Sequence, residues 1–257
     1  MEPIHIIAVE GLPLIHPEDN LGELIVTALK KQNMPLQDKD VIIATHVIVS
    51  KAEGNIINLD NIAPSERAKE IAQKTNKDPA LVEVILSESI DIVRIGPSSI
   101  ITETKSGSVS ANAGIDRSNV SGDRNVVPLP KDPNASAQSI RKEIKRLTGA
   151  EVAVIVSDTH GRPFRKGEIN VAIGVAGLNP IRDRRGEKDL FGYVLRVKQT
   201  AIADELASAA ELVIGQANEG IPVAIIRGYN YEAYDNIPPT ELIRSKEKDL
   251  FRNQQVQ

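Results

Sequence analysis

Side chains that can hold a metal ion and a phosphate group follow one short apolar run. Val152–Val156 is apolar and mostly β-branched, a pattern typical of a short buried strand. Asp158 and Thr159 come next, and Gly161 and Pro163 predict that the strand has ended in a loop there. A carboxylate at a strand end can bind a hard cation, and cationic side chains beside it can bind phosphate oxygens. The cations of this stretch are Arg162, Arg165 and Lys166.

The same stretch also has a simpler interpretation. In a turn, the Asp158 carboxylate would accept hydrogen bonds from nearby backbone N–H groups, and the cations would be solvated. Considered alone, the stretch favours neither interpretation.

Oxygen-bearing side chains at predicted loop positions, in this stretch and in others, extend the metal interpretation. They are Asp116, Asn119, Asp158, Thr159, Gln216 and Glu219. Oxygen ligands without Cys or clustered His suit Mg²⁺ or Mn²⁺. Magnesium uses only one or two protein carboxylates, so Asp116 and Asp158 would be enough if the fold brings them together.

A lysine and a histidine accompany a second apolar run. Val41–Val49 (VIIATHVIV) predicts a strand, which places His46 inside it and Lys51 just beyond its end. Lys51 could reach a phosphate, but a lysine at an exposed strand end is more often solvated. A single His in a strand is more often structural than a ligand.

Composition excludes several kinds of site. The chain has no Cys, which rules out disulfides, thiolate zinc sites and cysteine nucleophiles. It lacks the GxxxxGK[ST], GxGxxG, GxSxG and HExxH signatures, and its four His residues show no zinc-ligand spacing.

A formal net charge of −4 and an aromatic content of 3% argue against nucleic acid as a partner.

No segment predicts export or membrane insertion. The N-terminal sequence MEPIHIIAVEG lacks the basic start and the long apolar core of a signal peptide. No apolar run approaches the ~18 residues of a membrane helix. Together with the absence of Cys, this leads us to expect a cytoplasmic protein.

Strands and helices are mixed without strict alternation, which predicts an α+β fold with largely antiparallel sheets. Further strands are expected at 4–9, 92–95, 100–104, 108–113, 170–176 and 222–227. Helices are expected after Asn20, at 66–74, from Pro79, after a cap at Asn134 or Ser136, at 200–213 and at 239–251. The 257 residues are expected to form one domain, with a subdomain break near 128–134.

Eight motifs, in order along the chain, resemble those of the coenzyme F420:L-glutamate ligases. They are Gly11–Ile15 (GLPLI), Val49–Gly54 (VSKAEG), Pro64–Ala72 (PSERAKEIA), Asn112–Val120 (NAGIDRSNV), Ser157–Gly167 (SDTHGRPFRKG), Ala172–Gly177 (AIGVAG), Lys188–Tyr193 (KDLFGY) and Gly215–Gly228 (GQANEGIPVAIIRG). They cover nearly the full chain, which makes the resemblance far more specific than any single motif. No nitroreductase-like extension is seen, so the chain resembles the stand-alone archaeal form.

The resemblance implies a fold, an assembly and a set of ligands. It implies two intertwined subdomains and a butterfly-like homodimer. It also implies GTP, two divalent ions (Mg²⁺ or Mn²⁺) and K⁺. The expected partners are GTP, L-glutamate and coenzyme F420-0.

The resemblance also assigns roles to individual residues. GTP is expected to contact Gly11, Leu12, Pro13, Leu14, His46, Val47, Lys51, Asn119, Gly215, Gln216, Ala217, Asn218, Glu219, Gly220, Ile221 and Pro222. The divalent ions are expected at Asp116, Asp158, Thr159 and Gln216, with Lys51, Asp116 and Asp158 carrying the catalysis. Arg162 and Arg165 are added on physical grounds as phosphate-binding side chains.

The implied reaction is a GTP-dependent ligation. The γ-phosphoryl group of GTP would pass to the terminal carboxylate of coenzyme F420-0, and the glutamate amine would attack the acyl phosphate, releasing GDP and phosphate and then forming a γ-linked glutamate. Two alternatives use the same residues: a metal-dependent hydrolase of nucleotides or phosphate esters, and a nucleotide-binding dimer without catalysis. The residues by themselves barely separate the ligase from the hydrolase, and the resemblance favours the ligase.

Overall fold

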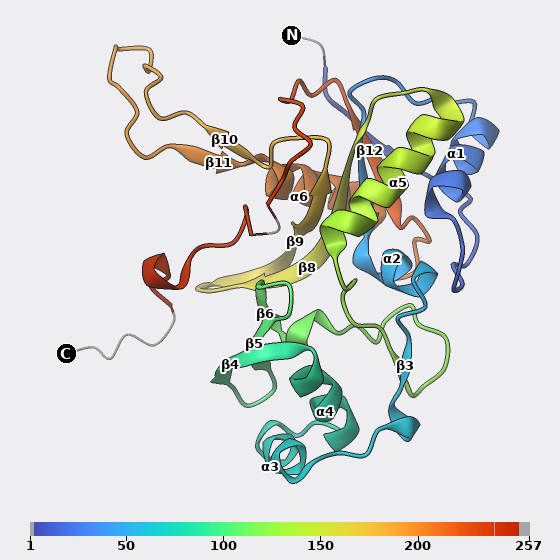
Figure 1. The fold of residues 1–257 in the computed structure, drawn as a ribbon, viewed down its shortest axis with the longest axis vertical. Helices are drawn as coiled ribbons and strands as arrows, with labels where there is room; N and C mark the ends of the chain where they lie inside the picture. Colours follow the sequence, from blue (N-terminus) through green and yellow to red (C-terminus); the bar gives the residue numbers. More distant parts are fainter. Residues whose placement is uncertain (1–2, 239, 252–257) are drawn as a thin grey trace.

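The centre of the fold is a five-stranded sheet. The computed structural model describes residues 3–238 and 240–251. The strands lie in the order β1-β12-β2-β8-β9 (Figure 1). Their bounds are β1 His5–Ala8, β12 Val223–Arg227, β2 Val41–Thr45, β8 Ala153–Arg162 and β9 Arg165–Ala176. β2 and β8 run parallel, and the other three pairings of this sheet are antiparallel.

Helices cover both faces of this sheet. The helices are α1 Leu21–Lys31, α2 His46–Ala52, α5 Pro133–Thr148 and α6 Ile202–Ile214. Successive side chains of a strand point to opposite faces. Ile42 therefore packs with α1 and α5 in one core, while Ile43 packs with α6 in another. Because both faces are buried, the first four residues of β2, Val41 to Ala44, are all apolar rather than alternating.

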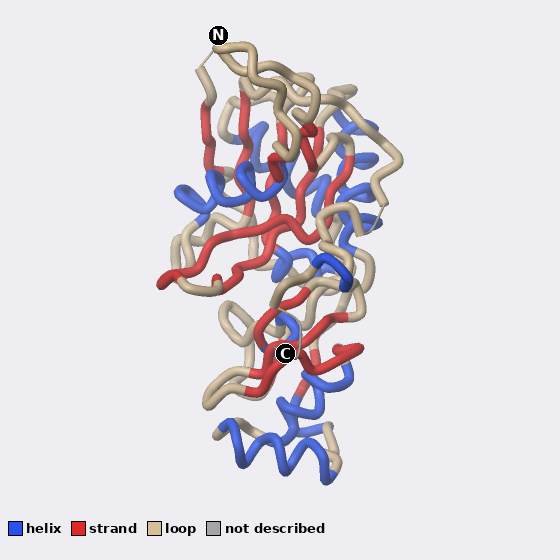
Figure 2. The backbone as a smooth tube through the Cα atoms, turned by 90° about the vertical axis from the view of Figure 1, so that its left-hand side faces the viewer, coloured by secondary structure: helices blue, strands red, loops and turns tan. Residues whose placement is uncertain are grey.

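A smaller unit lies beside the sheet, at the lower end of the elongated molecule (Figures 1 and 2). Its elements are β3 Ile57–Asn58, α3 Glu66–Thr75, α4 Pro79–Ser87, β4 Ser89–Ile95, β5 Ile100–Thr104, β6 Val109–Ala111 and β7 Asn125–Val126, with 3₁₀ helices at Leu59–Asn61 and Asn112–Gly114. β4, β5 and β6 form the predicted antiparallel meander. The unit is inserted between α2 and α5 and has its own apolar core. Together, the two units confirm the α+β fold class.

An arm projects from the main body. β10 (Ile181–Asp183) and β11 (Gln199–Ala201) pair antiparallel, and the loop joining them extends into solvent (Figure 1). Leu190 and Phe191 near its tip are 99% and 96% exposed. Large apolar side chains that are exposed next to one another indicate an interaction surface, whereas single exposed apolar side chains are common on any protein.

Side-chain caps begin the helices where the sequence predicts them. Asn20 Oδ1 accepts a hydrogen bond from the Glu23 N–H at the start of α1, and Ser65 Oγ accepts one from the Ala68 N–H at the start of α3. Asp78 caps α4 with Pro79 at its first position. These caps satisfy backbone donors that have no partner within the helix.

The predicted strand Val41–Val49 is wrong in its second half. β2 ends at Thr45, and His46 begins α2. Because a short apolar run fits a buried helix as well as a buried strand, its periodicity could not separate the two. The change matters because His46 and Lys51 lie on one helix rather than on a strand and its loop.

The predicted loop after Val156 is also wrong. β8 continues through Ser157 and Asp158 to Arg162, paired along this length with the equally long β9. The register shifts between Val156 and Ser157. Pairing with β9 therefore overrides the local turn chemistry, and the turn falls at Pro163 and Phe164 instead.

Two helix predictions also need correction. α5 is capped by Asp132, whose Oδ1 accepts from the Ala135 N–H, rather than by Asn134 or Ser136. Asn134 Oδ1 instead accepts a hydrogen bond from the N–H of Val175 on β9. The predicted helix at 239–251 is reduced, over 240–251, to a 3₁₀ turn at Lys246–Lys248, and residue 239 lies outside the described residues.

The subdomain break near 128–134 and the single-domain assignment stay predictions. No helix within residues 3–238 and 240–251 is both long and apolar enough to cross a membrane.

A buried ion pair joins two parts of the sheet layer. Arg227, on β12, donates from Nε and Nη2 to the two carboxylate oxygens of Asp40, just before β2, at 2.8 and 2.7 Å. The Asp40 side chain is 1% exposed. We expect Asp40→Ala to lower the free energy of unfolding by about 3–5 kcal/mol, because a largely buried guanidinium would lose its counter-charge. Urea unfolding followed by circular dichroism measures this.

The matched control is Glu66→Ala. Glu66 pairs with Lys69 on the surface of α3, where its side chain is 84% exposed. This loss should cost no more than about 1 kcal/mol. Equal destabilisation by the two substitutions would contradict the role given to the Asp40–Arg227 pair.

Candidate active site

A single cleft contains most of the residues predicted from the sequence. It lies between the sheet, α2, the Leu12–Ile15 turn and the inserted unit. Of the predicted residues, it is lined by Leu12, Pro13, Leu14, His46, Val47, Lys51, Asp116, Asn119, Asp158, Thr159, Gly215, Gln216, Ala217, Glu219, Gly220, Ile221 and Pro222. Gly11, Asn218, Arg162 and Arg165 do not line it.

The parallel pairing of β2 and β8 explains why distant segments meet here. Parallel strands end at the same edge of a sheet, and Thr45 lies opposite Ser157. The loop after α6 joins them because the Thr45 N–H donates a hydrogen bond to the Pro222 carbonyl at 3.1 Å. Ligands of open α/β sheets bind at this kind of edge, beyond the carboxyl ends of the strands.

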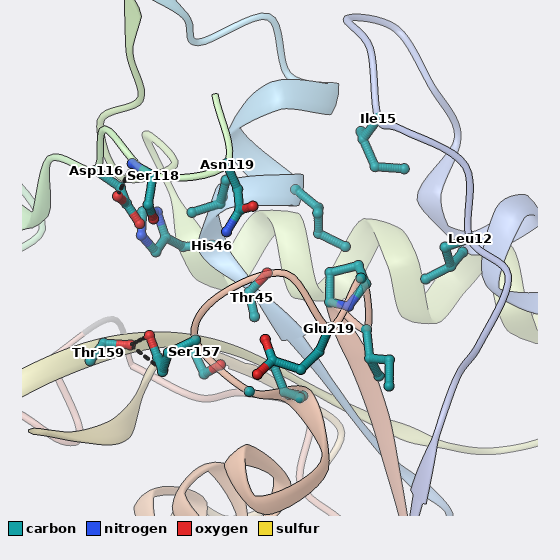
Figure 3. Close-up of a pocket in the computed structure, with 18 of the residues that line it drawn as sticks. Leu12, Ile15, Thr45, His46, Asp116, Ser118, Asn119, Ser157, Thr159 and Glu219 are labelled. Atoms are coloured by element: carbon teal, nitrogen blue, oxygen red, sulfur yellow. Dashed lines mark hydrogen bonds between the residues drawn. The ribbon is translucent and has the colours of Figure 1, made fainter. Parts of the chain in front are cut away.

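The inserted unit supplies the opposite wall. Figure 3 shows Asp116, Ser118 and Asn119 on one side of the cleft, across from Thr159 and Ser157 on the strands. Asn119 Nδ2 donates to the carbonyl of Ala217 at 3.2 Å, which links this wall to the loop after α6. The Asp116 backbone pairs with Val127 in an isolated bridge. Asp116 and Asp158 therefore line one cleft although 42 residues separate them in the chain.

Asp158 is a buried carboxylate between two histidines. His46 Nε2 lies 3.3 Å from Asp158 Oδ1, and His160 Nε2 lies 3.0 Å from Oδ2. The second contact has the distance of an ion pair without hydrogen-bond geometry, so Oδ2 has no hydrogen-bond donor within the described residues. The Thr159 N–H donates to Oδ1 at 2.8 Å.

The surroundings of Asp158 keep it ionised. Burial raises the pKa of the Asp158 carboxyl, but the charge of His46, the contact with His160 and the Thr159 N–H lower it by more. The net pKa lies below the ordinary value, so the group is an anion near neutral pH.

The donors in the cleft fit a divalent cation. Asp158 Oδ2 and the hydroxyl of Ser157 are buried and lack hydrogen-bond partners in the part of the chain described, which leaves lone pairs free for a ligand. No set of three His, Asp or Glu side chains in residues 3–238 and 240–251 is clustered as a complete metal site. Magnesium and manganese need few protein carboxylates when phosphate and water supply the other ligands, so the two observations agree.

Lys51 lies in the last turn of α2 and lines the cleft. Burial lowers the pKa of its ammonium group. No carboxylate among the described residues forms an ion pair with it, so its charge is available to an anionic ligand. Its position in the cleft is compatible with phosphate binding, and that role stays a prediction.

Sequence reasoning did not select two polar residues at this wall: Asn170, which lines the cleft, and Glu211, which does not line it but contacts Asn170. Asn170, on β9, is 2% exposed and donates to the carboxylate of Glu211 on α6. Burial raises the pKa of Glu211 against the effect of its contacts with Gln216 and Asn170, and the charge of Glu219 raises it further. Asn170 carried one signal, a polar residue among apolar strand residues. Glu211 resembles any surface residue of a helix, so the sequence held no signal for it.

Arg162 and Arg165 lie at the tip of the β8–β9 hairpin, outside the cleft lining. Arg162 Nη2 donates to the Lys166 carbonyl at 3.2 Å across the hairpin. Their role as phosphate-binding side chains stays a prediction.

Comparison with known proteins identifies the family. Residues 11–228 match the family model described as F420-0:Gamma-glutamyl ligase. The chain belongs to this family. It is 52% identical over 252 residues to the coenzyme F420:L-glutamate ligase of Methanothermobacter thermautotrophicus, covering 97% of this chain and 99% of the relative. It is also 52% identical to the enzyme of that name from Methanocaldococcus jannaschii, over 91% and 90% of the two chains.

A more distant relative matches over the same extent. The coenzyme F420:L-glutamate ligase of Archaeoglobus fulgidus is 40% identical over 97% of this chain and 96% of its own. The resemblance inferred from the motifs is thereby confirmed.

The lowered pKa of Asp158 predicts a pH-dependent contribution to stability. A carboxyl group with a lower pKa in the folded state stabilises folding above its ordinary pKa, here 3.8, and loses that contribution as the pH falls toward the folded value. The difference in unfolding free energy between the wild type and Asp158→Asn should therefore shift in favour of the variant from pH 6 to pH 3. Urea titrations at the two pH values measure it. A difference that is constant with pH would contradict this account.

Proposed function

We propose that this protein is a GTP-dependent ligase that joins L-glutamate to the terminal carboxylate of coenzyme F420-0. Family membership supports the ligation, since the relatives are named coenzyme F420:L-glutamate ligases. The observation that carries the proposal is that Lys51, Asp116 and Asp158 all line one cleft.

The cleft has the two chemical ends that a nucleoside triphosphate needs. Leu12 and Ile15 lie away from Asp116 and Thr159 (Figure 3) and suit a planar base, while Lys51, also in the lining, supplies a positive charge for phosphate oxygens. Seven of the eight residues from Gly215 to Pro222, in the loop after α6, also line the cleft. We assign the GTP contacts to those of the predicted residues that line this cleft, which leaves out Gly11 and Asn218.

Asp116, Asp158, Thr159 and Gln216 would hold the divalent ions. Mg²⁺ or Mn²⁺ bound there would neutralise phosphate charge during phosphoryl transfer. The His46 and His160 side chains hold the Asp158 carboxylate in place from either side and keep it ionised. A binding site for K⁺ is part of the proposal through the family resemblance alone, and dependence of the rate on K⁺ tests it.

The proposed reaction proceeds in two displacements. A carboxylate oxygen of coenzyme F420-0 attacks the γ-phosphorus of GTP, the bond to the β,γ-bridging oxygen breaks, and GDP leaves. The amine of glutamate then attacks the acyl carbon, phosphate departs and one proton is lost, which leaves an amide. A further cycle would form a γ-linked glutamate. Lys51 stabilises charge on the transferring group, and the protein needs no nucleophilic side chain of its own.

Mass spectrometry of a reaction with GTP, Mn²⁺, L-glutamate and coenzyme F420-0 tests the proposal. We expect a product heavier by one or more glutamyl units, with one GDP formed for each unit. GDP formed without glutamylated product would indicate the hydrolase, and no GDP in the presence of K⁺ would leave only nucleotide binding.

Substitutions in the cleft test the assignment of roles. Lys51→Met should lower kcat/KM by about 10²–10³-fold, because a preorganised positive charge is lost from the transferring phosphoryl group. Asp158→Asn should keep the fold and abolish turnover. The assay above gives the rates, and circular dichroism checks folding. A variant at Asp158 that retains most of the wild-type kcat would remove this residue from the mechanism.

We also propose that the protein works as a butterfly-like homodimer with intertwined subdomains. Support comes from the arm between β10 and β11, where Leu190, Phe191 and Val197 are almost completely exposed in the single chain. A second copy of the chain covering the arm would remove this apolar surface from water.

The double substitution Leu190→Glu with Phe191→Glu should convert the dimer to a monomer, because charges on the arm would have to be desolvated on association. Sedimentation equilibrium measures the mass. Lys198→Glu, an exposed polar position on the same arm, is the control and should leave the dimer intact. A monomeric wild type, or a double variant that remains dimeric, would contradict this role of the arm.

A further inference from the structure

Four side chains in and behind the wall of the cleft form a closed ring of hydrogen bonds. The Thr159 hydroxyl donates to Asn170 Oδ1 at 3.1 Å, and Gln216 Nε2 donates to Thr159 Oγ1 at 3.0 Å. Asn170 Nδ2 and Gln216 Nε2 both donate to the carboxylate of Glu211. The ring thereby ties β8, β9, α6 and the loop after α6 to one another.

Glu211 determines which way the two amides point. A terminal amide can present either its NH₂ group or its oxygen, but a carboxylate oxygen that accepts a hydrogen bond requires the NH₂ group. Both carboxylate oxygens of Glu211 are used in this way, one for each amide. Asn170 Oδ1 is therefore left to accept from Thr159, and Gln216 Oε1 points away from Glu211.

The result is a pair of oxygens at the cleft. With Nε2 of Gln216 held by Glu211 and Thr159, its Oε1 lies 3.3 Å from Thr159 Oγ1. Thr159 and Gln216 both line the cleft, and Figure 3 shows Thr159 across from Asp116. Because Asn170 is 2% exposed, water cannot readily replace a lost partner in the ring.

We infer that Glu211, acting through Asn170 and Gln216, is a positioning residue that presents Gln216 Oε1 and Thr159 Oγ1 together as ligands for a divalent cation. The inference rests on the proposed function in one respect, the presence of that cation. Neutral oxygen atoms are good ligands for Mg²⁺ and Mn²⁺, and partners behind the ligands determine how well they are oriented.

Binding of Mn²⁺ in the presence of GDP, without the coenzyme or glutamate, provides a test that needs no turnover. Electron paramagnetic resonance of free Mn²⁺ gives the affinity. Glu211→Gln should weaken binding about 10-fold or more, because a second amide could present either end to its neighbours. Glu211→Asp should weaken it too, because the shorter carboxylate no longer reaches both amides. If Glu211 acted only through its negative charge at long range, Glu211→Asp would keep that charge and bind Mn²⁺ with the affinity of the wild type.

A compensating pair of substitutions separates orientation from simple loss of a side chain. In Asn170→Asp combined with Glu211→Gln, the new amide donates to the new carboxylate and accepts from Gln216, and Thr159 still donates to position 170. All pairings and the net charge are kept, so Mn²⁺ affinity should return to within about threefold of wild type, a coupling between neighbouring sites.

Glu205→Gln, exposed on the same helix, is the control and should bind Mn²⁺ like the wild type. Thermal unfolding of every variant identifies any that fails to fold. Affinities within twofold of wild type for both Glu211→Gln and Glu211→Asp would overturn the positioning role while leaving the ligase proposal intact. A wild type that binds no Mn²⁺ with GDP would overturn the proposed metal site, and this inference with it.

Discussion

Burial of the Asp158 carboxylate is the interaction on which the rest of the site depends. An ionised carboxylate removed from water is costly unless charges or hydrogen-bond donors surround it. Here, His46 and His160 approach its two oxygens, and a backbone N–H completes the set. This arrangement requires β2 and β8 to be parallel neighbours, because His46 follows the end of β2 and Asp158 lies on β8.

The inserted unit gives the cleft its second wall. A sheet edge alone presents donors on one side, whereas the triphosphate that we propose as ligand would need partners on more than one side. The insertion between α2 and α5 brings Asp116 and Asn119 across the cleft, and the hydrogen bond from Asn119 to Ala217 joins the two walls. The ring of hydrogen bonds around Glu211 joins separate elements within the wall formed by the sheet, since it ties β8 and β9 to α6. Several separate elements must therefore pack correctly before the site exists.

The helix starts at Asn20, Ser65 and Asp78 follow from local hydrogen bonding and were predictable. The family, too, could be inferred from eight ordered motifs, which is how most of the cleft residues were anticipated. Errors arose where tertiary packing overrides local preference. Residues after Thr45 form a helix because it can bury Ile48 and Val49 against the sheet. The strand through Asp158 persists because β9 is there to pair with it.

The sequence by itself determined the fold class, the caps of α1, α3 and α4, the exclusion of thiol chemistry and the set of oxygen donors, because these depend on residue type and short-range spacing. Only the tertiary structure decided which donors meet. The contact of Asp158 with His46 spans 112 residues, and no local pattern encodes such a distance. The same holds for Glu211, whose partners Asn170 and Gln216 come from a strand and a loop. An acid on a helix acquires a structural role only when the packed neighbours supply donors and exclude water.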